Sequence, residues 1–294
     1  MDSLDMPPLL GRGNRAHVYH CERKGVGQVA TKMTTYRQHA ETGAPLEFVL
    51  LTKVQGHPNV VRLLGCDLGE NSTMMLHMEL VPGGCTIRDL IEDGQTEWCT
   101  AADVRVDHGV VLLGEYNVWS LWRKVATALA HCHAMGIAHR DVKADNVLVV
   151  QTVETIDPTQ PLADQLDVRL CDFDLASQFE GNQRVDSYPG TLEYAAPEIV
   201  AGVPHEPAKA DVWALGVMLY VMFKCSYPFG NDKARTRCYI MHGRWDFDRH
   251  EDRPVPEGAR QLMERMLTTF WPARPSIAEV LTHPWVTHNP SVVK

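Results

Sequence analysis

The sequence predicts an α+β protein with two unequal parts: a small antiparallel sheet with one main helix in residues 1–81, and a larger, mainly helical part in residues 82–294. Two observations predict this division. In the first part, short runs of alternating apolar residues are separated by turn residues, which is typical of strands. Beyond Pro82, which two glycines follow, the apolar residues recur mostly at helical spacing.

Five strands and one helix are expected in the first part. The strand patterns cover residues 9–10, 16–21, 28–33, 60–67 and 74–80. A glycine-containing turn at 24–27 joins the second and third strands into a hairpin. After the third strand, helical spacing is shown by Leu46, Val49, Leu50 and Val54, and the turn residues at 56–59 end this helix.

The second part is expected to contain several helices. The clearest has one apolar face, made by Val118, Leu121, Trp122, Val125, Leu129 and Cys132. Further helices are predicted at 211–223, 259–267 and 276–282, the last opening with a capping box between Ser276 and Glu279. The expansion at 93–116 and the polar insert at 152–167 are expected to be extra surface loops.

Composition excludes several classes of protein. The 294 residues are 45% hydrophobic and 22% charged, which rules out wholesale disorder and fibrous structure. The longest apolar runs, such as 212–223, are shorter than the roughly 20 residues of a membrane span, and residues 1–5 lack the basic start of a secretory leader. Eight cysteines without a CxxC pair predict reduced thiols in a soluble intracellular protein, whether cytoplasmic or nuclear. A net charge of −9 predicts no nucleic-acid partner and mildly favours cationic partners.

Three features of the first part are suggestive together and weak alone. Gly11, Arg12 and Gly13 form a glycine-rich turn, which a plain tight hairpin explains equally well, and Ala16 stands where a third glycine would complete the motif. Nineteen residues after Gly13, Lys32 lies on an expected strand, and fifteen residues later Glu47 lies on the expected helix. A strand lysine held by a helix glutamate is a way to orient a phosphate-binding cation, although each could also be an ordinary surface charge.

Three motifs of the second part identify a family. Residues 139–146 read HRDVKADN, residues 171–174 read CDFD, and residues 190–198 read GTLEYAAPE. In this order they resemble the catalytic loop, metal-binding motif and substrate-docking segment of eukaryotic-type serine/threonine protein kinases. The resemblance runs from about residue 9 to about residue 286, and the ending THPWV at 282–286 is similar to calmodulin-dependent-type domains. It implies one bilobal catalytic unit with the sheet in the small N-lobe and the helices in the large C-lobe.

The resemblance implies a protein kinase that uses ATP and Mg²⁺ and phosphorylates protein serine or threonine. Asp141 would accept or orient the proton of the substrate hydroxyl, and Lys143 would neutralise charge on the transferred phosphoryl group. Asn146 and Asp172 would hold the magnesium ions through hard oxygen atoms. Together with Lys143, Thr191 marks the serine/threonine kinases, so tyrosine specificity is not expected.

The resemblance also implies a nucleotide site and a supporting frame. The residues expected to bind ATP are Gly11, Arg12, Gly13, Val18, Ala30, Lys32, Glu47, Met78, Glu79, Val81 and Leu148. Within this set Lys32 would bind the α- and β-phosphates, Val18, Ala30 and Leu148 would enclose the adenine ring, and residues 79–81 would form the hinge. The frame would be a stack of Leu51, Leu63, Phe173 and His139 anchored at Asp211, and a pair between Glu198 and Arg274.

Two departures from the family pattern leave an alternative open. Asp174 stands where the family usually has glycine, and Ala16 replaces the last glycine of the loop, so a pseudokinase scaffold with weak or no phosphotransfer is the second hypothesis. The short spacing between Lys32 and Glu47 predicts that the glutamate helix begins late, after a loop at 36–45.

Regulation and substrate choice are predicted less sharply. Arg140 is expected to pair with a phosphate that an upstream kinase places on Ser187, although a plain surface serine is an equal alternative. Asp145 and Glu193 stand where basophilic kinases carry acids, while two other such positions hold Cys85 and Val221. The expected preference for basic residues around the target serine is therefore weak.

Overall fold

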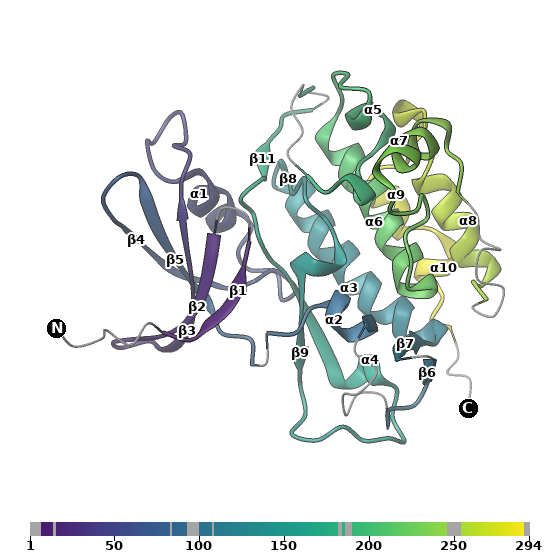
Figure 1. Ribbon diagram of the computed structural model, residues 1–294, viewed down its shortest axis with the longest axis horizontal. Helices are drawn as coiled ribbons and strands as arrows, with labels where there is room; N and C mark the ends of the chain where they lie inside the picture. Colours follow the sequence, from purple (N-terminus) through teal and green to yellow (C-terminus); the bar gives the residue numbers. More distant parts are fainter. Residues whose placement is uncertain are drawn as a thin grey trace.

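The first part of the chain folds as a five-stranded antiparallel sheet with the strand order β1-β2-β3-β5-β4. The computed structural model describes residues 7–13, 16–82, 84–92, 100–107, 109–181, 184–185, 190–245 and 254–290. The strands are β1 Leu9–Arg12, β2 Ala16–Arg23, β3 Gly27–Thr35, β4 Leu63–Leu68 and β5 Thr73–Glu79, with helix α1 Leu46–Lys53 beside them. Figure 1 shows this sheet on the left and the larger, mainly helical part on the right, so the predicted bilobal kinase-like architecture is confirmed.

Helix α1 begins late, as its spacing from β3 predicted. Pro45 precedes it with a ψ of 127°, and the Leu46 amide donates to the Arg37 carbonyl oxygen at 2.7 Å. Gln38 also pairs with Pro45 across the same loop. The loop therefore turns back on itself, and its Arg37 carbonyl accepts from the first amide of α1. In a longer helix, a carbonyl of an earlier turn would accept that hydrogen bond.

The larger part is built around two long helices, α3 Glu115–Ala134 and α6 Pro207–Lys224. Every residue of α6 from Ala210 onward is buried, and the Trp122 indole of α3 donates to the Leu215 carbonyl oxygen of α6 at 3.1 Å. A helix that is apolar on all sides is expected at the centre of a core. Helix α6 begins four residues before the predicted start, because Pro207 is well suited to the first turn of a helix.

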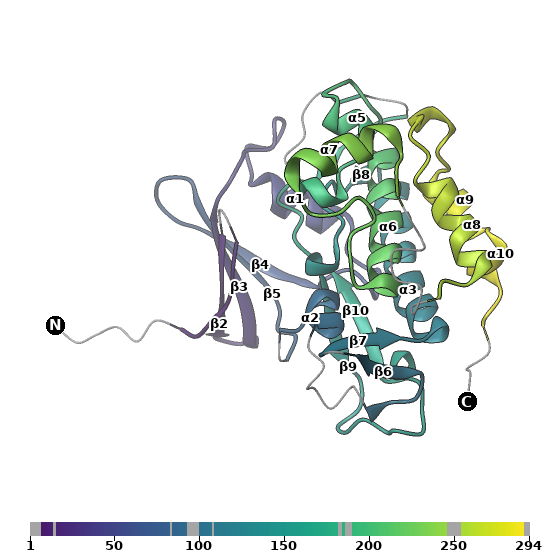
Figure 2. The same cartoon turned by 45° about the vertical axis from the view of Figure 1, so that its right-hand side comes forward.

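Shorter elements surround these two helices (Figure 2). The helices are α2 Ile87–Glu92, α5 Pro197–Val200, α7 Lys233–His242, α8 Glu257–Met266, α9 Ile277–Leu281 and α10 Pro284–Thr287, and the strands are β8 Ile137–Ala138, β9 Val147–Gln151, β10 Leu166–Leu170 and β11 Ser177–Gln178. The predicted capping box of α9 is confirmed, with reciprocal bonds between Ser276 and Glu279. None of the helices in the described part of the chain combines the length and apolar character of a membrane span.

The two inserts are folded together and are not separate surface loops, which corrects the prediction. The first contains the hairpin β6 Val104–Asp107 and β7 Val110–Leu113, and the second contains the helical turn α4 Leu162–Gln165. The Ala102 amide donates to the Gln160 carbonyl oxygen at 3.0 Å, and the Asn117 side chain bonds both inserts. Leu162 is completely buried. Because most of residues 152–167 are polar, the sequence pattern did not reveal that Leu162, Ala163 and Gln165 are buried.

Candidate functional site

One half of the site is an ion cluster centred on Lys32 of β3. The Lys32 ammonium lies 2.7 Å from Glu47 Oε1 on α1. It also lies 2.7 Å from Asp172 Oδ1, in the loop that follows β10. The structure thus brings together three residues that sequence reasoning placed in one site. Lys32 and Glu47 are almost completely buried, whereas the Asp172 side chain is 41% exposed.

The electrostatics of this cluster keep Lys32 charged. Burial alone would lower the pKa of Lys32, but the charges of Glu47 and Asp172 outweigh it and raise that pKa above its ordinary value. Burial pushes the pKa of Asp172 upward, and Lys32 more than offsets this, so the pKa of Asp172 is lowered. Glu47 Oε2 has no hydrogen-bond partner among the described residues. The cluster therefore holds a fixed cation beside carboxylate oxygens that are not saturated.

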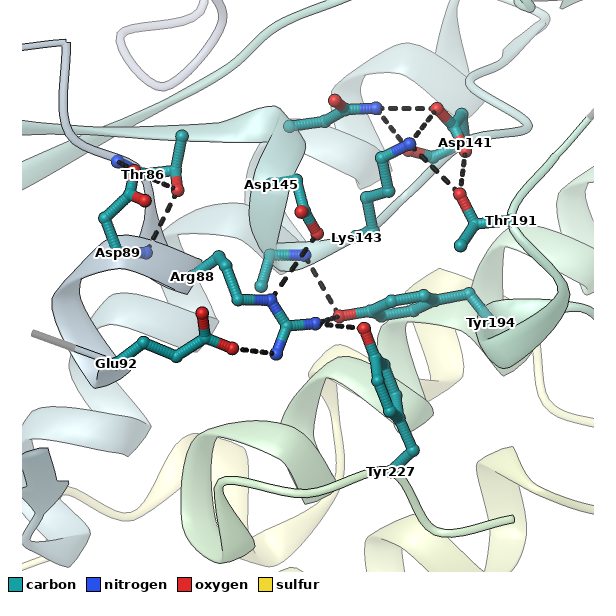
Figure 3. Close-up of polar contacts among 12 residues, drawn as sticks. Thr86, Arg88, Asp89, Glu92, Asp141, Lys143, Asp145, Thr191, Tyr194 and Tyr227 are labelled. Atoms are coloured by element: carbon teal, nitrogen blue, oxygen red, sulfur yellow. Dashed lines mark hydrogen bonds and ion pairs between the residues drawn. The ribbon is translucent and has the colours of Figure 1, made fainter. Parts of the chain in front are cut away.

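The other half of the site is a network around Asp141 (Figure 3). Asp141 Oδ2 accepts from Lys143 Nζ and from Asn146 Nδ2, both at 2.8 Å, and the Asn146 amide also donates to the Asp141 carbonyl oxygen at 2.9 Å. Lys143 Nζ further donates to the Thr191 hydroxyl at 3.1 Å. In the part of the chain that the structure describes, Oδ1 contacts only the Thr191 hydroxyl, at 3.5 Å. Among the described residues, Oδ1 is thus the less engaged of the two carboxylate oxygens.

Asp211 of α6 fixes the backbone before Asp141. Its carboxylate accepts from the backbone amides of His139 at 2.8 Å and Arg140 at 2.7 Å, and from the His133 ring at 2.8 Å. Arg140 has a φ of 65°, a left-handed conformation that is costly for a residue with a side chain. Two charge-assisted bonds donated to a carboxylate that is 1% exposed hold this strained turn and the backbone that leads into Asp141.

Of the predicted stack, His139 and Phe173 are in direct contact, and Leu51 and Leu63 belong to the same apolar core. The His139 and Phe173 rings meet edge to face with centroids 4.7 Å apart, and His139 Nε2 contacts the Cys171 carbonyl oxygen at 2.9 Å. Leu51 is buried in the same core, with Leu63 packed against that core. Burial raises the pKa of the Cys171 thiol to about 12, which makes it an inert thiol at neutral pH.

The two departures from the family pattern do not strain the backbone. Ala16 is an ordinary extended residue of β2 opposite Thr34, while Asn14 and Arg15 lie outside the described residues. In this segment the left-handed residue is Asp172, with a φ of 63°, and Asp174 is not among the described residues of positive φ. The Asp174 amide bonds the Asp172 carboxylate, and the Arg37 guanidinium donates to the Asp174 carbonyl oxygen. Position 174 therefore does not need glycine in this conformation.

Most of the residues expected to bind nucleotide lie on neighbouring strands of the five-stranded sheet. Val18 pairs with Lys32 across β2 and β3, and Ala30 pairs with Met78 across β3 and β5. Leu148 lies on β9 in the larger part. In the glycine-rich turn, which includes Gly11 and Arg12 of β1, the Gly13 amide donates to the Ala16 carbonyl oxygen at 2.8 Å.

The segment from Glu79 to Val81 connects the two parts. The Glu79 carboxylate accepts from the Arg62 amide at 2.8 Å and lies 3.3 Å from the Arg169 guanidinium of β10. The Glu79 side chain is thus engaged within the protein, which leaves its backbone as the part suited to a ligand. Val81 is buried, and its carbonyl oxygen accepts from the Gly84 amide at 3.2 Å.

The donor set of this site fits magnesium bound together with a phosphate ligand. Because both hydrogens of the Asn146 amide nitrogen are directed at Asp141, the amide oxygen is left for another partner, and the half-exposed Asp172 carboxylate is the second hard donor. Among the described residues there is no group of three or more histidine, cysteine, aspartate or glutamate side chains that could hold a metal alone. One carboxylate and one amide suit Mg²⁺, which takes its remaining ligands from water and phosphate oxygens.

Two arginines at the site were not predicted from the sequence, and one predicted serine lies outside the described residues. Arg37 contacts the Asp174 backbone, and Arg88 contacts Asp145 within the 139–146 segment; no local sequence signal distinguishes them from surface arginines. Ser187 lies outside the described residues, so its predicted pairing with Arg140 stays a prediction.

Comparisons with known proteins agree with this geometry. A sequence model of the protein kinase domain matches residues 5–286. Sperm motility kinase 3A of Mus musculus is 25% identical over 288 residues, which cover 98% of this chain and 50% of that protein. Testis-specific serine/threonine-protein kinase 3 of Homo sapiens is 27% identical over 267 residues, 90% of this chain and 87% of that protein. Calcium/calmodulin-dependent protein kinase type II subunit delta of Oryctolagus cuniculus is 29% identical over 299 residues, 99% of this chain and 50% of that protein. The chain thus spans about half the length of two of these relatives.

Proposed function

Because the chain belongs to the protein kinase domain family, we propose that it is an active serine/threonine protein kinase, which transfers the γ-phosphoryl group of Mg-ATP to hydroxyl groups of protein substrates. The observation that carries the proposal is the pairing of two networks in one structure. Lys32 is held between Glu47 and Asp172, and Asp141 is held by Lys143 and Asn146. Phosphoryl transfer needs little more from a protein than fixed cations, metal-binding oxygens and an oriented hydroxyl.

In the proposed reaction, the substrate hydroxyl oxygen bonds to the γ-phosphorus while the bond from phosphorus to the bridging oxygen of ADP breaks. Asp141 Oδ1, the less engaged oxygen, would orient the hydroxyl and accept its proton. Lys143 would stabilise negative charge on the transferred group, and Lys32 would bind the α- and β-phosphates. Asn146 and Asp172 would hold Mg²⁺, which when bound neutralises charge on the phosphate oxygens.

Two observations weigh against the pseudokinase alternative. It rested on Ala16 and Asp174, and neither residue is forced into a conformation that favours glycine. Asp174 instead contributes its amide to the Asp172 carboxylate. These contacts support an active enzyme over a scaffold that only presents its surface.

We propose two further properties at finer detail. Phosphorylation of Ser187 by an upstream kinase would add a dianion for Arg140 and activate the enzyme, and unchanged activity of Ser187→Ala in an unphosphorylated preparation would contradict this. The substrate would be a protein with a weak preference for basic residues near the target, through Asp145 and Glu193. ATP as substrate and the seven free cysteines of the described chain are typical of a reducing intracellular compartment.

A radiolabelled-ATP assay tests the proposed activity. We expect the purified protein with Mg-ATP to label itself and serine or threonine peptides, and Asp141→Ala to lower the rate by about 10²- to 10⁴-fold, the usual contribution of a positioned proton acceptor. Asp141→Ala should still bind Mg-ATP, since Lys32 and Asp172 are intact, and this binding is the folding control. Absence of both Mg-ATP binding and phosphotransfer in the wild type would overturn the proposal.

A further inference from the structure

Arg88 of α2 reaches across to the catalytic loop and is nearly buried there (Figure 3). Its side chain is only 13% exposed. The guanidinium lies 3.0 Å from Glu92 Oε1 and 3.8 Å from Asp145 Oδ2, and it donates to the hydroxyl of Tyr194 at 3.4 Å and to that of Tyr227. It also lies 5.0 Å from the centre of the Tyr227 ring. We name these partners, Glu92, Asp145, Tyr194 and Tyr227, the arginine pocket.

The walls of the arginine pocket are fixed independently of Arg88. The Tyr194 and Tyr227 rings pack edge to face with centroids 5.8 Å apart. The Tyr194 hydroxyl accepts from the Ala144 amide at 3.3 Å, which ties it to the catalytic loop. Helix α2 is anchored by buried Ile87 and by reciprocal bonds between Thr86 and Asp89. The pocket should therefore keep its shape when the Arg88 side chain is removed.

Without Arg88 the arginine pocket would be a receptor for a guanidinium group. Two carboxylates, two phenol oxygens and an aromatic face are the groups that bind arginine through charge, directed bonds and stacking. Asp145 and Glu92 are 48% and 60% exposed, so a ligand can reach them. With Arg88 in place, these groups already face one positive charge, and a second guanidinium would meet a filled space and a like charge.

The arginine pocket adjoins the segment that carries the proposed base, because the Tyr194 hydroxyl bonds the Ala144 amide and Asp145 lies in that segment. Asp145 follows the proposed base Asp141 by four residues, and the same close-up contains both. A peptide that presents its hydroxyl to Asp141 would extend by about 3.3 Å per residue, so side chains a few positions from the acceptor would be within reach of this surface.

We propose that Arg88 is a specificity-determining residue: it fills the arginine pocket with the enzyme's own guanidinium and thereby keeps the preference for basic substrate residues weak. This inference rests on the proposed function, because it assigns the substrate selectivity of that same site. It predicts that removing the Arg88 side chain converts an indifferent enzyme into one that selects arginine at one substrate position.

Peptides with one serine in an alanine and glycine background test this, with a single arginine placed at each position from five before to three after the serine. For the wild type, kcat/KM should change less than about threefold at every position. For Arg88→Ala, kcat/KM should rise at least about tenfold at one position. Arg88→Lys, which keeps the charge, should remain indifferent, and Arg88→Ala with Asp145→Asn should lose most of the gain.

The variants are first checked for folding by their melting temperature and Mg-ATP binding, and Arg88→Gln replaces Arg88→Ala if the alanine variant does not fold. A wild type that already selects arginine strongly, or a folded Arg88 variant without a gain at any position, overturns the inference. If the wild type transfers no phosphate, the proposed function fails by itself. The inference is then decided by fluorescence anisotropy with the labelled arginine peptides: binding at least tenfold tighter to the folded Arg88 variant supports it, and equal binding overturns it.

Discussion

Two ion clusters of this protein, Arg274 with Glu198 and Lys32 with Glu47 and Asp172, differ in how completely their hydrogen-bonding groups are paired. In the larger part, the Arg274 guanidinium bonds both Glu198 oxygens at 2.7 and 2.9 Å, and the two side chains are at most 1% exposed. The remaining Arg274 donors meet the carbonyl oxygens of Lys209 and Thr268, and the guanidinium lies 5.0 Å from the Trp213 ring. At the Lys32 cluster, one ammonium faces two carboxylates, Glu47 Oε2 has no described partner, and Asp172 is half-exposed.

The difference shows how one kind of interaction can serve structure or function. The Arg274 cluster is saturated, because each carboxylate oxygen of Glu198 and each donor side of Arg274 has a partner within the protein. The Lys32 cluster is unsaturated, because one ammonium faces two carboxylates and Glu47 Oε2 has no described partner, which suits it to a further cation. Breaking the first cluster should therefore affect stability, and breaking the second should affect activity.

The largest effect is expected from Arg274→Ala. It leaves the Glu198 carboxylate buried without its partner, and breaking a buried pair in this way costs about 3–5 kcal/mol. Thermal or urea unfolding should show this loss in the free energy of unfolding, while activity per folded molecule stays within about twofold of wild type. Replacing both residues, with Arg274→Met and Glu198→Leu, should recover most of the stability. A loss below about 1 kcal/mol for Arg274→Ala would contradict the structural role.

Asp172→Asn should produce the reverse pattern. The substitution preserves size and a hydrogen bond to Lys32 but removes the charged oxygen proposed to hold Mg²⁺. We expect phosphotransfer to fall by about 10²- to 10³-fold, a typical cost of losing one group that stabilises charge in a transition state. The free energy of unfolding should change by less than about 1 kcal/mol, because this side chain is 41% exposed. A variant with wild-type kcat/KM would show that Asp172 has no part in catalysis.

The sequence predicted the site residues that lie within recognisable motifs. Lys32, Glu47, Asp141, Asn146 and Asp172 lie in recognisable segments, so their order alone indicated that they belong together. The late start of α1 followed from a residue spacing. Predicting which residues lie together needed only the local sequence and the order of segments, while the roles of these residues stay predictions.

Other contacts depend on the folded chain and had no local signal. Arg88 meets Tyr194 and Tyr227, which are 106 and 139 residues away, and neither helical periodicity nor a motif marks such a pairing. The insert at 152–167 appeared to be a surface loop because most of it is polar, yet Leu162 and Ala163 are buried, and the Ala163 amide donates to the Asn117 side chain of α3. Long-range packing of a few residues is therefore what the sequence patterns did not predict.

Glu47→Gln should have an intermediate effect on the unsaturated cluster. Glutamine keeps the size and one hydrogen bond to Lys32, and Asp172 still pairs with the ammonium at 2.7 Å. Losing one of two carboxylates should misorient Lys32 only in part, so kcat/KM should fall about tenfold, equivalent to about 1.4 kcal/mol. Steady-state kinetics at saturating and limiting ATP measure this. A loss as large as that of Asp172→Asn would mean that Glu47 holds Lys32 alone.

The smallest expected effect is a pH dependence that separates wild type from Asp172→Asn. Lys32 lowers the pKa of Asp172 in the folded protein, whereas the unfolded carboxyl titrates near its ordinary value of about 3.9. The folded state therefore holds the proton less tightly than the unfolded state, so the stabilisation by this carboxylate is fully present above about pH 4 to 5 and is lost as the pH falls through the lowered pKa. Urea unfolding of both proteins between pH 3 and 7 should show a stability difference below about 1 kcal/mol that is constant near neutrality and shrinks in acid. Because the two proteins share every other titrating group, a difference that grows as the pH falls would mean that Lys32 does not stabilise the charged form of Asp172.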